Sequence, residues 1–162
     1  MPDVSQSITV SRSPAEVWEV IGDPLAIADV LPMIESARMD GDLRVAAVAG
    51  GEIVERILEH SDAERFYTYE VVDGPMKLES YLSKLSVAPE GDGAVVLWEA
   101  DFEPPAGVPK EKVAAGIDQT YVTGLSALRG SRERGRRAAA RSRHGTTELA
   151  LRPQRQVRPG HR

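Results

Sequence analysis

Hydroxyl-bearing and aromatic residues recur at every second position in three stretches of the chain. Tyr67 shares a parity with Tyr69, Tyr81 shares one with Ser83, and Trp98 falls on the apolar parity of a later stretch. Side chains two residues apart in a β-strand point to one face, so we expect all five to face inward. Hydroxyl and indole groups on an apolar surface are typical of a ligand cavity. The alternative is a packed sheet whose tyrosine hydroxyls reach the rim.

An acidic residue joins this set where alternation does not choose a face. One parity of the stretch 52–60 contains Glu55, and the other contains Arg56. Either choice puts a charge among apolar residues, and such a charge must be paired or face a wet cavity. A buried Glu55 would have a raised pKa and could act as a general base, with Tyr69 or Tyr81 polarising a carbonyl group. With Arg56 pointing outward, the sequence assures no arginine or histidine in the cavity.

Other catalytic and binding motifs carry weak signals. Residues 1–129 contain one histidine, His60, which lies between Glu59 and the pair Ser61-Asp62. Neighbours along a turn do not converge as the members of a Ser-His-Asp triad must, and one histidine does not build a metal site. The glycine-bearing turns lack the Lys-Ser/Thr and the following helix of a phosphate-binding loop. The sequence therefore predicts no metal, no cofactor and no nucleotide.

Strand and helix signals place these residues on a sheet. Residues 4–10 alternate as a first strand. A helix follows with the capping-box pattern of Ser13 and Glu16 and ends at Gly22, and a second short helix begins at Asp23. Six stretches joined by short turns come next, which indicates an antiparallel meander. They are residues 33–39, 44–49, 52–60, 65–72, 78–87 and 94–102.

The last predicted element is a helix from Pro109 to about Arg129. Gly116, Thr120 and Gly124 stand four residues apart and therefore lie one above another. A glycine inside a helix costs about 1 kcal/mol relative to alanine, so two on one stripe need a reason. A close backbone crossing is one reason and space for a ligand is another; the spacing leaves both open. The neighbouring apolar stripe consists of Val113, Ile117, Tyr121, Leu125 and Leu128.

Length and composition favour one globular domain. The chain has 162 residues, of which 41% are hydrophobic and 28% are charged, an ordinary globular mixture. It has no cysteine, which excludes disulfides and fits a reducing compartment. No apolar run reaches the ~18 residues of a membrane span, and the N-terminus lacks the pattern of a signal peptide. We therefore expect a cytoplasmic protein without a membrane span.

The charges divide the chain into two parts. Residues 1–129 contain 23 acidic and 10 basic side chains, whereas residues 130–162 contain ten arginines and two glutamates. The second part has no Phe, Trp or Tyr, so we predict a folded domain of residues 1–129 and a disordered basic tail. A basic arm could bind nucleic acid. Without interleaved aromatic residues or a folded reader, the sequence favours an incidental extension, such as one read in a shifted frame.

The order of elements resembles the helix-grip fold of the START and birch-pollen-allergen-like superfamily (SRPBCC). Residues 13–18, Ser-Pro-Ala-Glu-Val-Trp, and the Gly-Asp-Pro at 22–24 resemble the opening of bacterial polyketide cyclase/dehydrase-like and lipid-transport-like members. Residues 55–58, 69–75 and 78–83 resemble strands of plant abscisic acid receptors. The resemblance covers about residues 4–129 and does not include the basic tail. It implies an α+β fold in which a seven-stranded curved antiparallel sheet wraps around a long C-terminal helix, with two short helices after the first strand.

The same resemblance implies a ligand site and turns Glu55 inward. The residues it places there are Glu55, Tyr69, Tyr81, Ser83 and Trp98 on the cavity wall and Gly116, Thr120 and Gly124 on the helix side. The receptors' Ser-Gly-Leu-Pro gate is replaced near residues 49–51, their His-Arg-Leu latch is Met-Lys-Leu at 76–78, and their ligand-holding lysine falls near Leu31. We therefore expect not abscisic acid but a ligand held by hydroxyl and carbonyl groups.

Three functions are compatible with these residues. The main prediction is binding of a hydrophobic small molecule, lipid-like or polyketide-like, in the cavity between the sheet and the last helix. The alternative is a polyketide cyclase/dehydratase-type enzyme that uses Glu55, Tyr69 and Tyr81 for proton transfer. The third treats the cavity as vestigial and the basic tail as the functional part.

Overall fold

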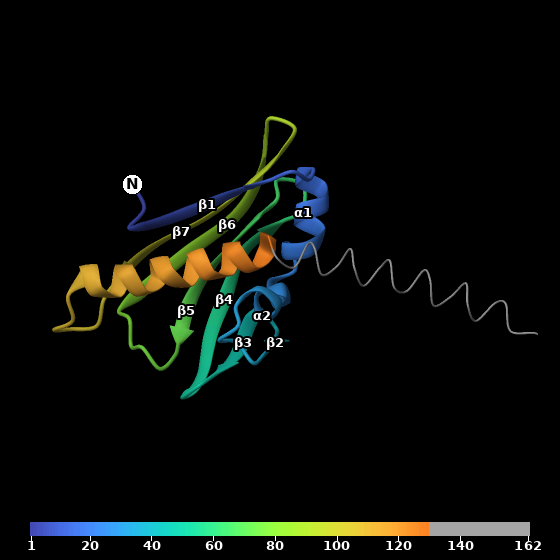
Figure 1. The fold of residues 1–162 in the computed structure, drawn as a ribbon. Coiled ribbons are helices and arrows are strands. Elements are labelled where there is room, and N and C mark those ends of the chain that lie inside the picture. Colours follow the sequence, from blue (N-terminus) through green and yellow to red (C-terminus); the bar gives the residue numbers. More distant parts are fainter. Residues whose placement is uncertain (130–162) are drawn as a thin grey trace, which may run out of the picture. The chain divides into compact units, whose positions relative to one another are not determined.

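The computed structural model describes residues 1–129, which form one sheet, two short α-helices, a 3₁₀ turn and a long helix. Seven antiparallel strands follow the order β1-β7-β6-β5-β4-β3-β2. A helix over residues 110–129, called the long helix below, lies across one face of this sheet (Figure 1). The other elements are β1 (Val4–Val10), α1 (Pro14–Ile21), η1 (Pro24–Ala26), α2 (Ile27–Val30), β2 (Ser36–Asp40), β3 (Leu43–Val48), β4 (Gly51–Ser61), β5 (Phe66–Asp73), β6 (Ser80–Glu90) and β7 (Gly93–Glu103).

This architecture is the helix-grip fold that the resemblance implied. β2 to β7 form the expected meander. β1 adds an edge strand by pairing with β7 from Val4↔Ala100 to Val10↔Ala94. No helix within residues 1–129 is long and apolar enough to cross a bilayer. The predicted basic tail, with its question of nucleic-acid binding, lies outside the described residues.

The first helix begins at the predicted cap. The Ser13 hydroxyl accepts a hydrogen bond from the Glu16 N–H (3.2 Å) and donates one to Glu16 Oε1 (3.2 Å). The Glu16 carboxylate therefore accepts its hydrogen bond from the Ser13 side chain, whereas in the usual capping box it accepts from the backbone N–H of the cap residue. The helix ends at Gly22, where an added Cβ atom would lie 2.5 Å from the Trp18 ring. A larger residue there would displace the indole.

Two predicted strands begin too early. Residues 33–35 precede β2 because the Ile34 N–H donates to the Leu31 carbonyl (3.1 Å) in a turn. The Leu78 N–H likewise donates to the Met76 carbonyl (3.1 Å), and β6 starts two residues later. Such local bonds use the donors that a strand would offer to its neighbour. The predicted β6 also ended early, since the strand continues to Glu90; every other predicted strand end lies within one residue of the observed one.

Strand β4 is irregular, which explains its ambiguous pattern. The register with β5 shifts between Val54 and Glu55 and again between Ile57 and Glu59. Glu55 faces inward and is 6% exposed, whereas Glu59, which has the same parity, is exposed. An extra residue in one strand reverses the faces that follow it. The strand therefore buries one carboxylate of this parity and leaves the other in water.

The two glycines of the helix stripe have different surroundings. A Cβ atom at Gly124 would lie 2.8 Å from Leu31 Cδ2 and 2.8 Å from Trp98 Cζ3. At Gly116 no neighbouring atom lies within 4 Å of that position, and the residue is exposed. A close crossing therefore accounts for Gly124 alone. One turn before it, Tyr121 stacks on Trp98 with 4.2 Å between ring centroids.

We expect alanine to have opposite effects at the two glycines. Gly124→Ala forces the Trp98 ring and Leu31 to move and should lower the free energy of unfolding by about 1–3 kcal/mol. Gly116→Ala meets open space and should raise it by about 0.5–1 kcal/mol, because alanine favours a helix interior. Urea denaturation followed by circular dichroism measures both. Equal effects at the two positions would contradict the close crossing.

Candidate functional site

A cavity of about 160 Å³ lies between the sheet and the long helix. Ile27 and Leu31, from α2 and the residue after it, form part of its apolar wall. Polar side chains from the sheet and the long helix also line it, namely Glu55, Tyr69, Tyr81, Thr120 and Tyr121. The hollow expected under the helix is therefore present, and it has the mixed lining that is typical of ligand sites.

Glu55 is paired with an arginine that the sequence analysis missed. Arg44 Nε donates to Glu55 Oε1 at 3.0 Å, and the guanidinium is fully buried. Its Nη1 donates to the Pro24 carbonyl (2.8 Å) and to the Tyr67 hydroxyl (3.2 Å). The guanidinium carbon also lies 4.6 Å from the centroid of the Tyr69 ring. Among the described residues, Nη2 has no hydrogen-bond partner.

The sequence assured no arginine at the cavity, and the structure supplies one, Arg44, as the partner of the lining residue Glu55. Arg56 does point outward, where it pairs with Glu70 (3.1 Å) and Asp42 (3.5 Å). Arg44 was available from the hairpin: it lies directly opposite Glu55 in the β3–β4 ladder, five residues before the Ala49-Gly50 turn as Glu55 is five residues after it. Cross-strand partners on one face touch, so the register of this hairpin was the signal that could have found the pair.

Burial and charge act against each other in this pair. Burial raises the pKa of the Glu55 carboxyl above its usual range, while the Arg44 charge acts to lower it. For Arg44, burial acts to lower the pKa, but Glu55 and the two tyrosines Tyr67 and Tyr69 outweigh it and raise the pKa. A guanidinium does not lose its proton in a protein. The cation is thus permanent, and Glu55 is its buried counter-charge.

A second polar cluster connects β5, β6, β7 and the long helix. The Tyr121 hydroxyl is hydrogen-bonded to the hydroxyls of Tyr81 and of Ser83, the latter at 2.9 Å. Ser83 Oγ also donates to the Glu99 carbonyl (3.0 Å). Trp98 Nε1 donates to Ser83 Oγ (3.2 Å) and to the Tyr69 hydroxyl (3.1 Å). Each buried polar group here therefore has a partner, as buried groups require.

The comparisons with known proteins agree with this geometry. A family model described as polyketide cyclase / dehydrase and lipid transport matches residues 1–133. The chain belongs to this family. No curated protein matches the chain.

Solved structures of similar proteins share the fold of this polyketide cyclase/dehydrase and lipid-transport family member. The protein XoxI from Bacillus cereus is 31% identical, with a TM-score of 0.74 over 79% of this chain and 93% of that chain. A Thermobifida fusca protein is 25% identical, with a TM-score of 0.68 over 77% and 89%. A START superfamily protein from Mycobacterium smegmatis is 17% identical, with a TM-score of 0.69 over 81% and 97%, and shows the fold alone.

The structure of this family member brings most of the predicted site residues together. Five of them line the cavity: Glu55, Tyr69, Tyr81, Trp98 and Thr120. Ser83 is buried behind them and holds Tyr121 and Trp98 through the hydrogen bonds above. Gly124 lies against the far side of Trp98, and Gly116 is exposed and outside the lining. Sequence reasoning assigned Tyr121 to the packing stripe, whereas it also supplies a hydroxyl to the cavity.

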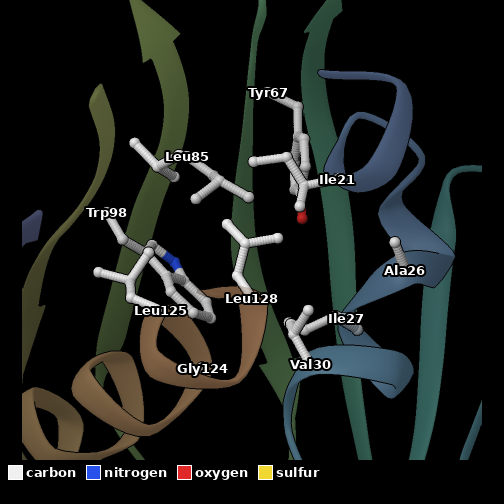
Figure 2. A pocket seen from close by; sticks show the side chains of 11 residues that line it. Ile21, Ala26, Ile27, Val30, Tyr67, Leu85, Trp98, Gly124, Leu125 and Leu128 are labelled. Carbon is white, nitrogen blue, oxygen red and sulfur yellow. The ribbon is translucent and has the colours of Figure 1, made fainter. Parts of the chain in front are cut away.

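A smaller hollow lies beyond Trp98, between α1, α2 and the end of the long helix. Its volume is about 20 Å³, which is room for about one water molecule. Figure 2 shows Ile21, Leu85 and Leu128 around it, with Gly124 on the helix below Trp98. Trp98 and Ile27 line both hollows. These two side chains therefore form the partition that limits the length of the larger cavity.

His60 has a structural contact and does not form a triad in this family member. Its Nε2 lies 2.8 Å from the Gly22 carbonyl and 3.5 Å from Asp62 Oδ1. The Ser61 hydroxyl instead accepts from the Glu64 N–H (3.1 Å). Asp62 also accepts from Trp18 Nε1 (2.9 Å), so these contacts fasten the end of α1 to the sheet. Within residues 1–129, no three His, Asp or Glu side chains are grouped as a metal site needs.

Breaking the buried ion pair from one side should destabilise the fold. We expect Arg44→Met to lower the free energy of unfolding by about 3–5 kcal/mol, because Glu55 is left as a buried lone charge. The double variant Arg44→Met/Glu55→Leu removes both charges and should be more stable than the single variant. Urea denaturation of the three proteins measures the difference. A double variant no better than the single one would contradict the lone-charge explanation.

Alkaline titration should report the buried hydroxyls. Burial raises the pKa of Tyr67, and it raises those of Tyr69, Tyr81 and Tyr121 well above their usual range. These are all four tyrosines of the chain. Unfolded tyrosines lose their protons near pH ~10, so the native state holds protons there that the unfolded state releases. The corresponding stability is present below that pH and is lost as the pH rises further.

Phenolate absorbance should therefore appear together with unfolding, as one cooperative step above pH ~10, when both are followed in the same titration. A gradual rise of phenolate absorbance near that pH with the native circular dichroism intact would show that the hydroxyls are not buried.

Proposed function

We propose that this protein binds a hydrophobic small molecule in the cavity between the sheet and the long helix. The observation that carries the proposal is the cavity itself: about 160 Å³ lined by apolar side chains and a few inward polar groups. A closely packed interior rarely leaves voids much larger than a water molecule. An apolar cavity of about 150 Å³ admits a ligand of the size of benzene. A single aromatic ring is therefore the scale of ligand that fits.

The polar groups suit orientation better than proton transfer. Glu55 is tied to Arg44 Nε at 3.0 Å, and a cation at that distance opposes uptake of a proton by the carboxylate. Tyr81 and Tyr121 hydrogen-bond to each other, which reduces their freedom to polarise a substrate carbonyl. Burial does raise the pKa of Glu55, which is what a general base near neutral pH needs. The polyketide cyclase/dehydratase-type activity therefore remains the second candidate, with Glu55, Tyr69 and Tyr81 as its residues.

A cavity-filling substitution tests the binding proposal with toluene as the probe. Toluene should raise the midpoint of thermal unfolding of the full chain, because a ligand that binds only the native state stabilises it. Ala46 lines the cavity and is fully buried, so Ala46→Leu should abolish this shift. Ala47 is its neighbour on β3 and does not line the cavity, which makes Ala47→Leu the matched control. No shift for the wild-type chain, or an equal shift for Ala46→Leu, would overturn the proposal.

A further inference from the structure

The positions of the hydrogens in the tyrosine cluster follow from one carbonyl group. Ser83 Oγ donates to the Glu99 carbonyl at 3.0 Å, so its only proton is committed. Tyr121 must therefore be the donor in its 2.9 Å bond to Ser83. With the Tyr121 proton committed in turn, Tyr81 must be the donor in the bond between the two tyrosines. Tyr81 and Tyr121 thus offer lone pairs and no free protons.

The other polar groups of the lining also offer hydrogen-bond acceptors and no free donors. Thr120 Oγ1 donates to the Gly116 carbonyl at 3.0 Å, which leaves its lone pairs available. Glu55 is the counter-charge of Arg44, and a carboxylate only accepts hydrogen bonds. One of its oxygens binds Arg44 Nε, and the other has no protein partner among the described residues. The cavity therefore has an excess of acceptors, one of which is charged.

The remaining hydroxyl of the lining, that of Tyr69, belongs to the same cluster. Tyr69 accepts a hydrogen bond from Trp98 Nε1 at 3.1 Å, and its own hydroxyl acts as a donor toward Tyr81, where it helps to lower the pKa of that tyrosine. Its proton therefore has a partner within the cluster. A ligand hydroxyl supplies the donor that this lining lacks, since it donates one hydrogen bond. A ketone or an ether has no proton to donate and leaves the charged acceptor unpaired, and an unpaired buried acceptor is expensive.

We infer that the cavity selects small apolar molecules that carry a hydroxyl group, such as phenols, and discriminates against ketones, aldehydes and carboxylates of the same size. This selectivity rests on the proposed function. A ligand carboxylate would bring a second negative charge next to Glu55. An ammonium group would add a cation to a pair whose charges already cancel, because Arg44 lies 3.0 Å from the carboxylate. The neutral hydroxyl is the donor that this charge balance admits.

The experiment is a calorimetric titration of the full chain with phenol, benzaldehyde, benzoate and toluene. Toluene reports whether the cavity takes an aromatic ring at all, and benzaldehyde is the acceptor-only comparison to phenol. We expect phenol to bind about ten-fold more tightly than benzaldehyde, and benzoate not to bind. If benzaldehyde binds as tightly as phenol, or benzoate binds, the selectivity is overturned while the proposed function stands. If none of the four binds, the proposed function is overturned as well.

A substitution of Glu55 tests whether this residue causes the selectivity. Glu55→Gln can present an N–H donor to the cavity, so the preference for phenol should fall from about ten-fold to below about two-fold. The matched control is Glu59→Gln, an exposed glutamate on the same strand, which should leave the preference unchanged. If Glu55→Gln fails to fold, Arg44→Gln/Glu55→Gln replaces both charges by amides and is compared with the same control. A preference that persists in the folded variant would overturn the assignment.

Discussion

A fully buried arginine is the constraint on which the rest of this molecule depends. Arg44 needs a counter-charge and acceptors, and it obtains them from three separate places: Glu55 on β4, the Pro24 carbonyl in η1 and the Tyr67 hydroxyl on β5. The Tyr69 ring covers its guanidinium. Because a buried charge without partners is prohibitive, these elements must be assembled together or not at all. The pair thus fixes one end of the cavity wall.

The long helix fixes the opposite wall by approaching the sheet closely at one place. Gly124 lets the backbone come against Trp98 and Leu31, and Tyr121 stacks on the same indole one turn earlier. The Thr120 side chain, beside Tyr121, already borders open volume. The helix thus contacts the sheet closely at Gly124 and borders the cavity one turn earlier. The close contact at Gly124 therefore marks the end of the cavity along the helix.

The fold could be predicted from the sequence because its signals are local. Capping residues, turns and alternation depend on neighbours in the chain, and they identified seven strands and the helices that flank them. The site depends on contacts between strands. Arg44 was missed because Arg44, Val45 and Ala46 are all buried, so β3 has no alternation that marks an inward face. The alternation within β4 did not show which face of the sheet Glu55 points to, because two register shifts break the pattern of that strand. Pairing Arg44 with Glu55 required the hairpin register, which neither strand contains alone.

The ligand preference is harder to predict from the sequence than the cavity is. Two proteins with the same lining residues can differ in preference if their hydrogen bonds run in opposite directions, because a hydroxyl donates or accepts according to its other partner. Here the direction is set by Ser83, whose proton goes to the Glu99 carbonyl and thereby orients Tyr121 and Tyr81. Ser83 does not line the cavity, yet it decides what the lining offers. Membership of the family accounts for the fold that holds a hollow, and the chemistry inside the hollow follows from this buried serine and from the charge on Glu55.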